Sequence, residues 1–451
     1  MAAGGLEELD YYHGLLPRED LPVLLSKEGD YLLRCSQVKA GEDRRTILSM
    51  AYSVDGKIKQ GHYIITQERE PPNHYTIDKT LSKPTVDLLV QEYKTRRVPL
   101  KKEVPSTVLQ NAVTRPSWEL RADFVHTGKK LGDGEFGDVH QGKLKQLMGP
   151  GLPSKEIDVA IKVARKDIIS KEKIKEVMKE ARLMRDFDHP NVVKIYGVVV
   201  ERDPLMIVME LVDGGGLDKY LRTNAARITP AERLCIIQDA AWGIEYLHHK
   251  RIIHRDLAAR NCLIVNDHGR NLVKISDFGL SREGDAYAMK TVRKVPIRWL
   301  APETIQTFIY TAKSDVWAYG ILAWEVYTSG EEPYAGLPNA HIKQKIVAGE
   351  LLELPASAGA DVIKLIKVQC WEKDPVRRIS MSQVACKLEA MNGRTPPPVQ
   401  ESSVRKGVHA APAEPPRKLP TARRTKSRTR EEPSRQMTSG RIPQNKRARG
   451  P

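Results

Sequence analysis

The feature that most constrains this chain is an eight-residue run from His254 to Asn261 (HRDLAARN), followed sixteen residues later by Asp277-Phe278-Gly279. Asp256 offers a carboxylate to orient and deprotonate an attacking hydroxyl, while Asn261 and Asp277 offer the oxygen ligands that a hard cation prefers. A transferring phosphoryl group spreads negative charge over its oxygens, so a protein must hold metal against the phosphates and place a carboxylate beside the nucleophile. Ordinary turn and surface residues would explain an isolated Asp-Phe-Gly but not both motifs at this spacing. The pair therefore predicts phosphoryl transfer from a nucleotide.

A glycine-rich segment, Leu131–Val139 (LGDGEFGDV), lies between β-like runs, and Lys162 follows about twenty residues later in a Val-Ala-Ile-Lys run. Alone, Gly-x-Gly-x-x-Gly is weak evidence, because dinucleotide-binding folds use it at the start of a helix. Its position between strands instead predicts a hairpin loop that covers phosphates with backbone amides, with Lys162 reaching the α- and β-phosphates. We expect Glu180, in the helical run Lys173–Arg185, to hold this lysine in place, and Glu176 is the competing carboxylate.

Residues 11–101 are typical of a compact α+β unit. Three β-type runs, Tyr31–Ser36, Thr46–Val54 and Ile58–Gln67, are accompanied by helical patterns near Arg18–Ser26 and over Pro84–Arg96. One residue breaks the apolar pattern, because Arg34 alternates into the expected inward face of a central strand. A buried guanidinium is costly without an anionic partner, and its planar fork suits phosphate. The alternative is that Arg34 pairs with an internal carboxylate.

Three segments of this unit, Tyr11–Arg18, Tyr31–Ser36 and Gly61–Ile65, resemble an SH2 domain, a module that recognises phosphotyrosine peptides. The resemblance implies a central antiparallel sheet flanked by two helices. It also implies four phosphotyrosine-binding residues, namely Arg18, Arg34, Ser36 and His62. Two departures affect the expected affinity and peptide preference: Cys35 replaces the usual acidic residue, and Ile64 stands where some SH2 domains carry a second basic residue.

Residues 124–390 resemble a protein kinase domain, which implies a bilobal fold with ATP between the lobes. Six residues would have catalytic roles: Asp256, Lys162, Glu180, Arg260, Asn261 and Asp277. The implied ATP site is lined by Leu131, Gly132, Gly134, Phe136, Gly137, Val139, Ala160, Lys162, Met209, Glu210 and Val212. The implied metal is Mg²⁺, with Mn²⁺ as an alternative, and its ligands would be Asn261 and Asp277. The resemblance further implies that Asp315 braces the catalytic loop and that Glu303 pairs with Arg378.

The residue types near the catalytic aspartate resemble those of tyrosine kinases. Serine/threonine kinases generally place a lysine two residues after this aspartate, where this chain has Ala258, and Val295–Trp299 also matches the tyrosine-kinase pattern. Tyrosine is therefore the expected acceptor. We expect Tyr287 to be a phosphosite in the activation segment, because a phosphate there adds about two negative charges that would order the loop against Arg255.

An SH2-like unit directly followed by a tyrosine-kinase-like domain is similar to the Fes/Fer group of non-receptor tyrosine kinases. Members of that group usually carry a long membrane-curving region at the N-terminus, whereas about ten residues precede the SH2-like unit here. The expected function is transfer of the ATP γ-phosphate to protein tyrosines, with the SH2 unit binding tyrosine-phosphorylated partners. The alternative, a pseudokinase scaffold that only binds phosphotyrosine, is opposed because scaffolds commonly lose at least one of five catalytic residues that are all present here: Lys162, Glu180, Asp256, Asn261 and Asp277.

The formal net charge of +16 is concentrated in a tail. Residues 391–451 contain fifteen Lys and Arg but four Asp and Glu, which leaves +5 for the first 390 residues. Rich in Pro, Ser, Thr and Arg, this tail is expected to be disordered. Its basic runs suit acidic lipid, an acidic protein, nucleic acid or an import receptor, and a merely solvated tail is at least an equal alternative. Because the charge is confined to the tail, we expect no specific nucleic-acid binding.

The remaining features favour a cytoplasmic protein of α+β multidomain class. Five scattered cysteines form no Cys-x-x-Cys pair, which argues against a disulfide framework and a zinc site. The N-terminus lacks a signal sequence and a myristoylation site, so secretion is not expected, and any membrane contact would be peripheral at the plasma membrane. Residues 102–122 are expected to be an ordered connector with Trp118 as its anchor.

Overall fold

The computed structural model describes residues 5–39, 42–68, 74–134, 137–146, 154–165, 170–267, 270–289 and 295–397. Phe136 of the expected ATP site and the tail from residue 398 onward lie outside these ranges. Among the helices described, none combines the length and the apolar content required to cross a bilayer.

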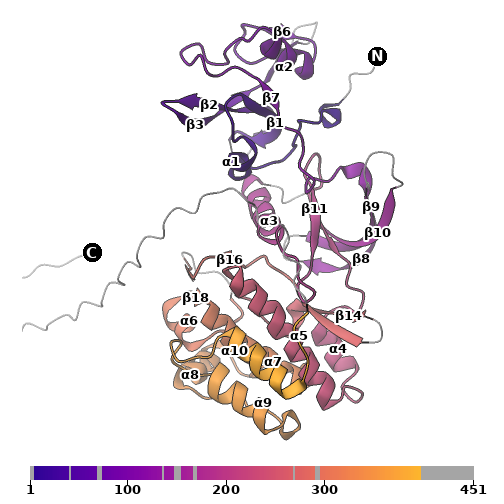
Figure 1. The fold of residues 1–451 in the computed structure, drawn as a ribbon, viewed down its shortest axis with the longest axis vertical. Helices are drawn as coiled ribbons and strands as arrows, with labels where there is room; N and C mark the ends of the chain where they lie inside the picture. Colours follow the sequence, from indigo (N-terminus) through magenta and orange to yellow (C-terminus); the bar gives the residue numbers. More distant parts are fainter. Residues whose placement is uncertain are drawn as a thin grey trace, which may run out of the picture. The chain divides into compact units, whose positions relative to one another are not determined.

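A four-stranded sheet organises the N-terminal part of the chain (Figure 1). Its order is β3-β2-β1-β7, with β1 at Asp30–Gln37, β2 at Arg44–Val54, β3 at Lys57–Ile64 and β7 at Asn111–Ala112. Strands β1, β2 and β3 are antiparallel, whereas β7 runs parallel to β1. The β2–β3 hairpin turns at Asp55-Gly56, where both residues have positive φ, the geometry that matches the twist of paired strands.

Short helices flank this sheet, and a small second sheet lies beside it. A 3-10 turn over Arg18–Asp20 leads into α1 (Leu21–Leu24), which is shorter than the helix expected over Arg18–Ser26. The other helix, α2 (Val86–Thr95), is capped by Thr85 and buries the apolar face that the sequence predicts. The small sheet consists of β4 (Thr66–Glu68), β5 (His74–Thr76) and β6 (Ser82–Lys83). The expected strand Ile58–Gln67 is thus divided, because buried Ile65 separates β3 from β4.

The N-terminal unit extends past the expected boundary at residue 101. Strand β7 pairs with β1 at Asp30↔Asn111, and Leu109 is buried in the same apolar core as Leu100. A two-residue strand carries no periodic pattern that could mark it in the sequence. The rest of the expected connector is ordered, since Glu119 forms a parallel bridge with Val198.

A curved five-stranded antiparallel sheet and one helix form the small lobe that follows. The strands are β8 (Val125–Gly134), β9 (Gly137–Gln146), β10 (Lys155–Ala164), β11 (Ile195–Val199) and β12 (Met206–Glu210), in the order β11-β12-β10-β9-β8. The helix is α3 (Lys171–Met184), whose N-cap Ser170 accepts a hydrogen bond from the backbone N–H of Lys173. Its buried residues recur at helical spacing, so that α3 packs one face against β11 (Figure 1).

The large lobe is mainly helical. Its helices are α4 (Leu217–Thr223), α5 (Pro230–His249), α6 (Pro302–Thr307), α7 (Ala312–Tyr327), α8 (Asn339–Ala348), α9 (Ala360–Lys364) and α10 (Met381–Asn392). Short strand pairs lie among them: β13 (Ile252–Ile253) with β16 (Arg282–Glu283), β14 (Cys262–Asp267) with β15 (Arg270–Ile275), and β17 (Ala286–Ala288) with β18 (Ile309–Thr311). Helix α7 is buried on all sides from Ser314 to Tyr327 and is the centre of this lobe.

The ordered C-terminal unit continues beyond the boundary expected at residue 390. Helix α10 includes Met391 and Asn392 and ends at Gly393, which has the positive φ common after a helix. Arg394 then forms an ion pair of 2.6 Å with the fully buried Asp239. The sequence did not predict this ion pair, because Arg394 stands at the start of the basic segment and sequence alone does not show which arginine has a buried partner.

Candidate active site

The catalytic loop is held from below by Asp315, as the sequence predicts. Its two carboxylate oxygens accept hydrogen bonds from the backbone N–H groups of His254 (2.8 Å) and Arg255 (2.9 Å). Asp315 lies in the first turn of α7, so the loop is anchored to a helix that is buried from Ser314 to Tyr327. Arg255 adopts a positive φ of 74°, which an unsupported loop would relax.

Asp256 lies at the end of this braced loop. Its carboxylate accepts hydrogen bonds from the Arg260 guanidinium and from Nδ2 of Asn261 at 2.8 Å. The His254 ring supports the backbone: its Nε2 is 3.1 Å from the Ser276 carbonyl, and its Nδ1 accepts the Asp256 N–H. Burial raises the pKa of Asp256, while Arg260 opposes this shift. Asp256 is therefore a fixed carboxylate whose proton affinity is greater than that of an exposed one.

Two oxygen-bearing side chains lie beside Asp256. Asn261 uses Nδ2 for Asp256, which leaves its Oδ1 available, and Asp277 is exposed with a positive φ of 59°. Phe278 is buried against Phe187 (5.1 Å between ring centroids) and orients the Asp277 backbone. One amide oxygen and one carboxylate fit a hard divalent cation that takes its remaining ligands from phosphates and water.

Lys162 and Glu180 form the ion pair that the sequence predicts. Nζ of Lys162 lies 2.8 Å and 3.0 Å from the two carboxylate oxygens of Glu180, and both side chains are buried. Glu176, the competing candidate, instead lies beside Lys173 at 3.4 Å. The pair links β10 to α3, so the position of the lysine depends on the position of the helix.

The expected ATP-lining residues come from adjacent strands. In the pairing of β10 with its neighbours, Lys162 stands opposite Val139, and Ala160 stands opposite Met209. Leu131, Gly132 and Gly134 lie along β8, Gly137 begins β9, Glu210 ends β12, and Val212 follows β12.

Steric crowding explains why one position of the glycine-rich loop, residue 137, is a glycine. A Cβ at Gly137 would lie 1.8 Å from the carbonyl oxygen of Val163, so only glycine allows this hairpin to cross β10 so closely. The side chain of Glu210 pairs with Lys274 at 2.9 Å, and its backbone N–H donates to the Lys194 carbonyl at 2.9 Å.

Tyr287 lies on β17, where it stands opposite Tyr310 of β18. The guanidinium of Arg255 is 4.2 Å from the Tyr287 ring centroid, and that of Arg282 is 5.4 Å away. The Nε atoms of Arg255 and Arg282 are buried without a hydrogen-bond partner in the structure. The expected phosphosite therefore lies among cations, as the sequence interpretation requires.

Sequence reasoning missed a buried carboxylate that joins the catalytic loop to the following loop. Glu325 of α7 accepts the Ala259 N–H and the Trp299 Nε1–H, each at 3.0 Å. Arg260 stacks on the Trp299 ring at 4.3 Å. The available signal was a single charged residue in the apolar run Ile321–Tyr327. The expected ion pair of Glu303 with Arg378 is present, at 2.6 Å and 2.9 Å.

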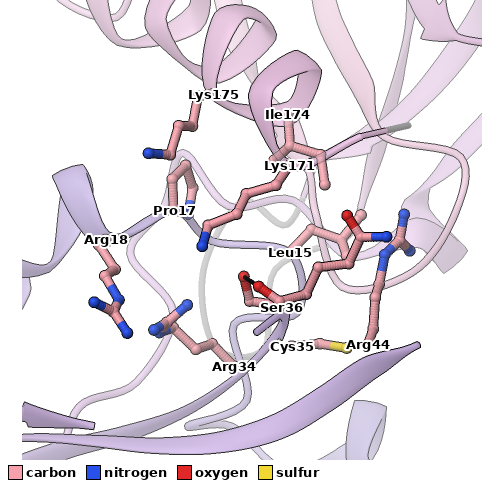
Figure 2. A pocket seen from close by; sticks show the side chains of 11 residues that line it. Leu15, Pro17, Arg18, Arg34, Cys35, Ser36, Arg44, Lys171, Ile174 and Lys175 are labelled. Carbon is pink, nitrogen blue, oxygen red and sulfur yellow. Dashed lines mark hydrogen bonds between the residues drawn. The ribbon is translucent and has the colours of Figure 1, made fainter. Parts of the chain in front are cut away.

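A second candidate site lies in the N-terminal unit, around Arg34. The Arg34 side chain is almost completely buried (1% exposed), and its Nε donates to the Ser49 hydroxyl at 3.0 Å. Its Nη2 has no hydrogen-bond partner among the residues that the structure describes. Arg18, Arg34 and Ser36 line a cavity there (Figure 2). His62 does not line it, but its Nδ1 is 3.1 Å from the same Ser49 hydroxyl, which the sequence analysis did not single out.

Electrostatics in this cavity favour an anion. Burial, followed by the nearby Arg18, lowers the pKa of Arg34 to about 10. Burial, with Arg18 and Arg34, lowers the pKa of His62 to about 4, so this imidazole is neutral at pH 7. Burial raises the pKa of Cys35, so the residue that replaces the usual acid contributes no charge. The alternative, that Arg34 pairs with an internal carboxylate, finds no such ion pair among the described residues, where the guanidinium donates to Ser49 instead.

Comparisons with known proteins match residues 125–388 to a family described as "Protein tyrosine and serine/threonine kinase". Fer-related kinase 1 of Caenorhabditis elegans is 35% identical over 384 residues, which cover 85% of this chain and 94% of that protein. The tyrosine-protein kinase transforming protein Fps of avian sarcoma virus (strain PRCII) is 37% identical over 387 residues and covered to 68% of its length. Human tyrosine-protein kinase Fer is 36% identical over 386 residues, and the chain covers 44% of it.

The matches span the N-terminal sheet as well as both lobes, since they cover 85% of this chain. A kinase domain of this kind uses ATP and a divalent metal ion and acts on protein substrates. The phosphoryl transfer that the two sequence motifs predict is thus the reaction of the protein kinase family that matches this chain. The chain belongs to the Fes/Fer family and is a protein-tyrosine kinase.

Proposed function

We propose that catalysis depends on Asp256 as the residue that orients the substrate tyrosine and accepts its proton. Lys162, held by Glu180, contacts the ATP phosphates, and the backbone of the glycine hairpin covers them. Asn261 and Asp277 would hold Mg²⁺, or Mn²⁺ in its place, which neutralises charge on the phosphates when bound. Arg260 supports Asp256 through its hydrogen bond.

The observation that carries this proposal is the Lys162–Glu180 pair, formed while Phe278 is buried beneath the catalytic loop. Lys162 is buried on β10, and Glu180 reaches it only when α3 packs against the sheet. With Asp256, Asn261 and Asp277 in the proposed roles, the chain would supply a phosphate-binding lysine, metal ligands and a base for positioned phosphoryl transfer. A pseudokinase scaffold would not need this arrangement.

The test is a transfer assay with magnesium-ATP and a mixed peptide containing Tyr, Ser and Thr. We expect phosphotyrosine as the product, and a loss of at least a hundredfold in kcat for Asp256→Asn, because general-base catalysis contributes about 10²–10⁴-fold. Phosphoserine would contradict the expected acceptor. Glu331→Gln, a neutralised exposed carboxylate in the large lobe, is the matched control. Equal rates for Asp256→Asn and the control would refute the assignment.

We also propose that the N-terminal unit is an SH2 domain that binds phosphotyrosine through Arg34, supported by Arg18, Ser36 and His62. Support comes from the buried Nη2 of Arg34, which lacks a partner, and from the excess of cations around it. A phosphate would supply the acceptor that this guanidinium lacks, and such charge-assisted pairs are strong. Binding a phosphorylated partner would raise the local concentration of substrate tyrosines.

Arg34→Lys tests this second assignment. A lysine keeps the charge but loses the fork that binds phosphate at two points, so phosphorylation of a partner that already carries phosphotyrosine should fall at least tenfold. A short peptide without phosphotyrosine should be phosphorylated at the wild-type rate. Equal losses on both substrates would instead indicate a structural role for Arg34.

We propose a cytoplasmic location, with the basic tail as a peripheral contact to an acidic membrane or partner. The five cysteines are free thiols, which is consistent with a reducing compartment.

Tyr287 is the proposed activating phosphosite, supported by the cations that surround it.

A further inference from the structure

The cavity around Arg34 is not built by the N-terminal unit alone. Its lining includes Lys171, Ile174 and Lys175, which all come from α3 of the small lobe. These residues recur at helical spacing, so one face of α3 forms a wall of the cavity opposite β1. Figure 2 shows this face across from Arg34 and Ser36.

Ion pairs hold this helix face against the N-terminal unit. Arg182 of α3 forms two hydrogen bonds of 2.7 Å with Asp20, and Lys175 lies 2.8 Å from Glu19. The Asp20 carboxylate is buried, so the Arg182 contact is partly shielded from solvent. The wall that α3 contributes is therefore a fixed part of the cavity.

The cavity contains more positive charge than the described carboxylates neutralise. Two of the cations that line it form ion pairs: Lys175 with Glu19, and Arg44 with Asp203. The other three cations that line the cavity form no ion pair with any carboxylate of the described ranges, namely Arg18, Arg34 and Lys171. Like charges in one partly buried cavity repel, and a dianion between them would remove the repulsion.

Lys171 is placed to reach such a dianion. It is the first residue of α3, where the backbone N–H groups give the helix end a partial positive charge. In Figure 2 its ammonium group points from α3 toward the side of the cavity that holds Arg18, Arg34 and Ser36. The unpartnered Nη2 of Arg34 lies buried on the same side.

We propose that the phosphotyrosine site is completed by the kinase lobe, with Lys171 of α3 as a ligand of the bound phosphate. This inference rests on the proposed phosphotyrosine function of Arg34 and adds a residue that lies outside the SH2 unit. The phosphate is held from two sides, by Arg34 and Arg18 on the sheet side and by Lys171 on the helix side. Affinity for phosphotyrosine is therefore a property of the full chain.

The experiment measures binding of a fluorescently labelled phosphotyrosine peptide to the full chain, without ATP, by fluorescence anisotropy. We expect Lys171→Gln to weaken binding about five- to tenfold, the effect of losing one charge-assisted contact. Lys171→Arg keeps the charge and should stay within about twofold of wild type. Lys173→Gln is the matched control, because it removes the same charge from the same helix at a residue that does not line the cavity.

The outcomes separate the two proposals. Wild-type affinity in Lys171→Gln, with binding lost in Arg34→Lys, overturns the role of Lys171 and leaves the SH2 assignment standing. Equal losses in Lys171→Gln and Lys173→Gln, or a loss in Lys171→Arg, also overturn it, because they indicate general helix charge or structure. Binding that survives Arg34→Lys overturns both proposals. Competition by inorganic phosphate, without competition by the unphosphorylated peptide, identifies the phosphate as the group recognised.

Discussion

Glu325 is a buried acid that joins two loops of the active site. Its carboxylate accepts hydrogen bonds from the Ala259 backbone and the Trp299 indole, while Arg260 stacks on that indole. Burial raises the pKa of Glu325 to about 7, against the lowering effect of these two hydrogen bonds. The residue thus links the loop that carries Asp256 to the 3-10 turn Ile297–Trp299, and its charge changes near neutral pH.

This shift predicts how the free energy of unfolding depends on pH. Because the folded pKa lies above the unfolded value, the contribution of Glu325 is fully present below about pH 4.5 and is lost as pH rises through about 7. The stability of Glu325→Gln relative to wild type should therefore improve by about 2–3 kcal/mol between pH 5 and pH 8. Denaturant unfolding at several pH values measures this difference. A difference that does not change with pH, as for the exposed Glu331→Gln control, would contradict it.

The sequence identified the residues whose roles depend on spacing along the chain. Asp256, Asn261 and Asp277 lie within short motifs, and in the structure Nδ2 of Asn261 donates to the Asp256 carboxylate. Glu325 and Lys171 were not found, because their roles arise only where distant segments pack. A sequence read alone contains no information on which helix face reaches a given cavity.

At the scale of elements, the long periodic segments were predicted best. The expected helix Lys173–Arg185 is α3 within two residues at its start, and the glycine segment is a hairpin between β8 and β9. Both have strong local signals, namely apolar residues at helical spacing and glycines between strands. The pairing of Lys162 with Glu180 then follows from the packing of one element on the other.

Short elements were predicted poorly, because tertiary contacts decide them. The expected helix Arg18–Ser26 became a 3-10 turn and the single turn α1, whose ends are fixed by contacts of the Leu15–Leu25 region with the small lobe. Strand β7 has two residues and exists through its parallel pairing with β1. Local propensity is too weak to specify either element.

At the scale of the whole molecule, the N-terminal unit and the small lobe share one apolar core. Leu16 and Leu21 belong to the same buried cluster as Met184 and Val198. His13 adds a polar contact, with its Nδ1 2.8 Å from the buried carboxylate of Glu119 in the connector. The backbone N–H of Leu15 donates to the Val200 carbonyl at 2.7 Å. The N-terminal unit and the small lobe, which are separate segments of the sequence, therefore pack against each other through a shared apolar core.

Packing at the C-terminal end of α10 predicts where the chain can be truncated without loss of stability. Truncation after Pro397 leaves the Arg394–Asp239 ion pair intact, whereas truncation after Ala390, the boundary that composition indicated, removes it together with the end of α10. Asp239 would then keep an ion pair with Arg270, at 3.3 Å and half exposed, and the backbone N–H of Val273, which donates to it at 3.2 Å. Because a buried carboxylate that loses a partner is costly, the shorter protein should be less stable by about 2–3 kcal/mol. Denaturant unfolding of both truncations measures this, with Arg394→Gln in the full chain as the matched point variant. Equal stability of the two truncations would show that Arg270 and the Val273 N–H satisfy Asp239 without Arg394.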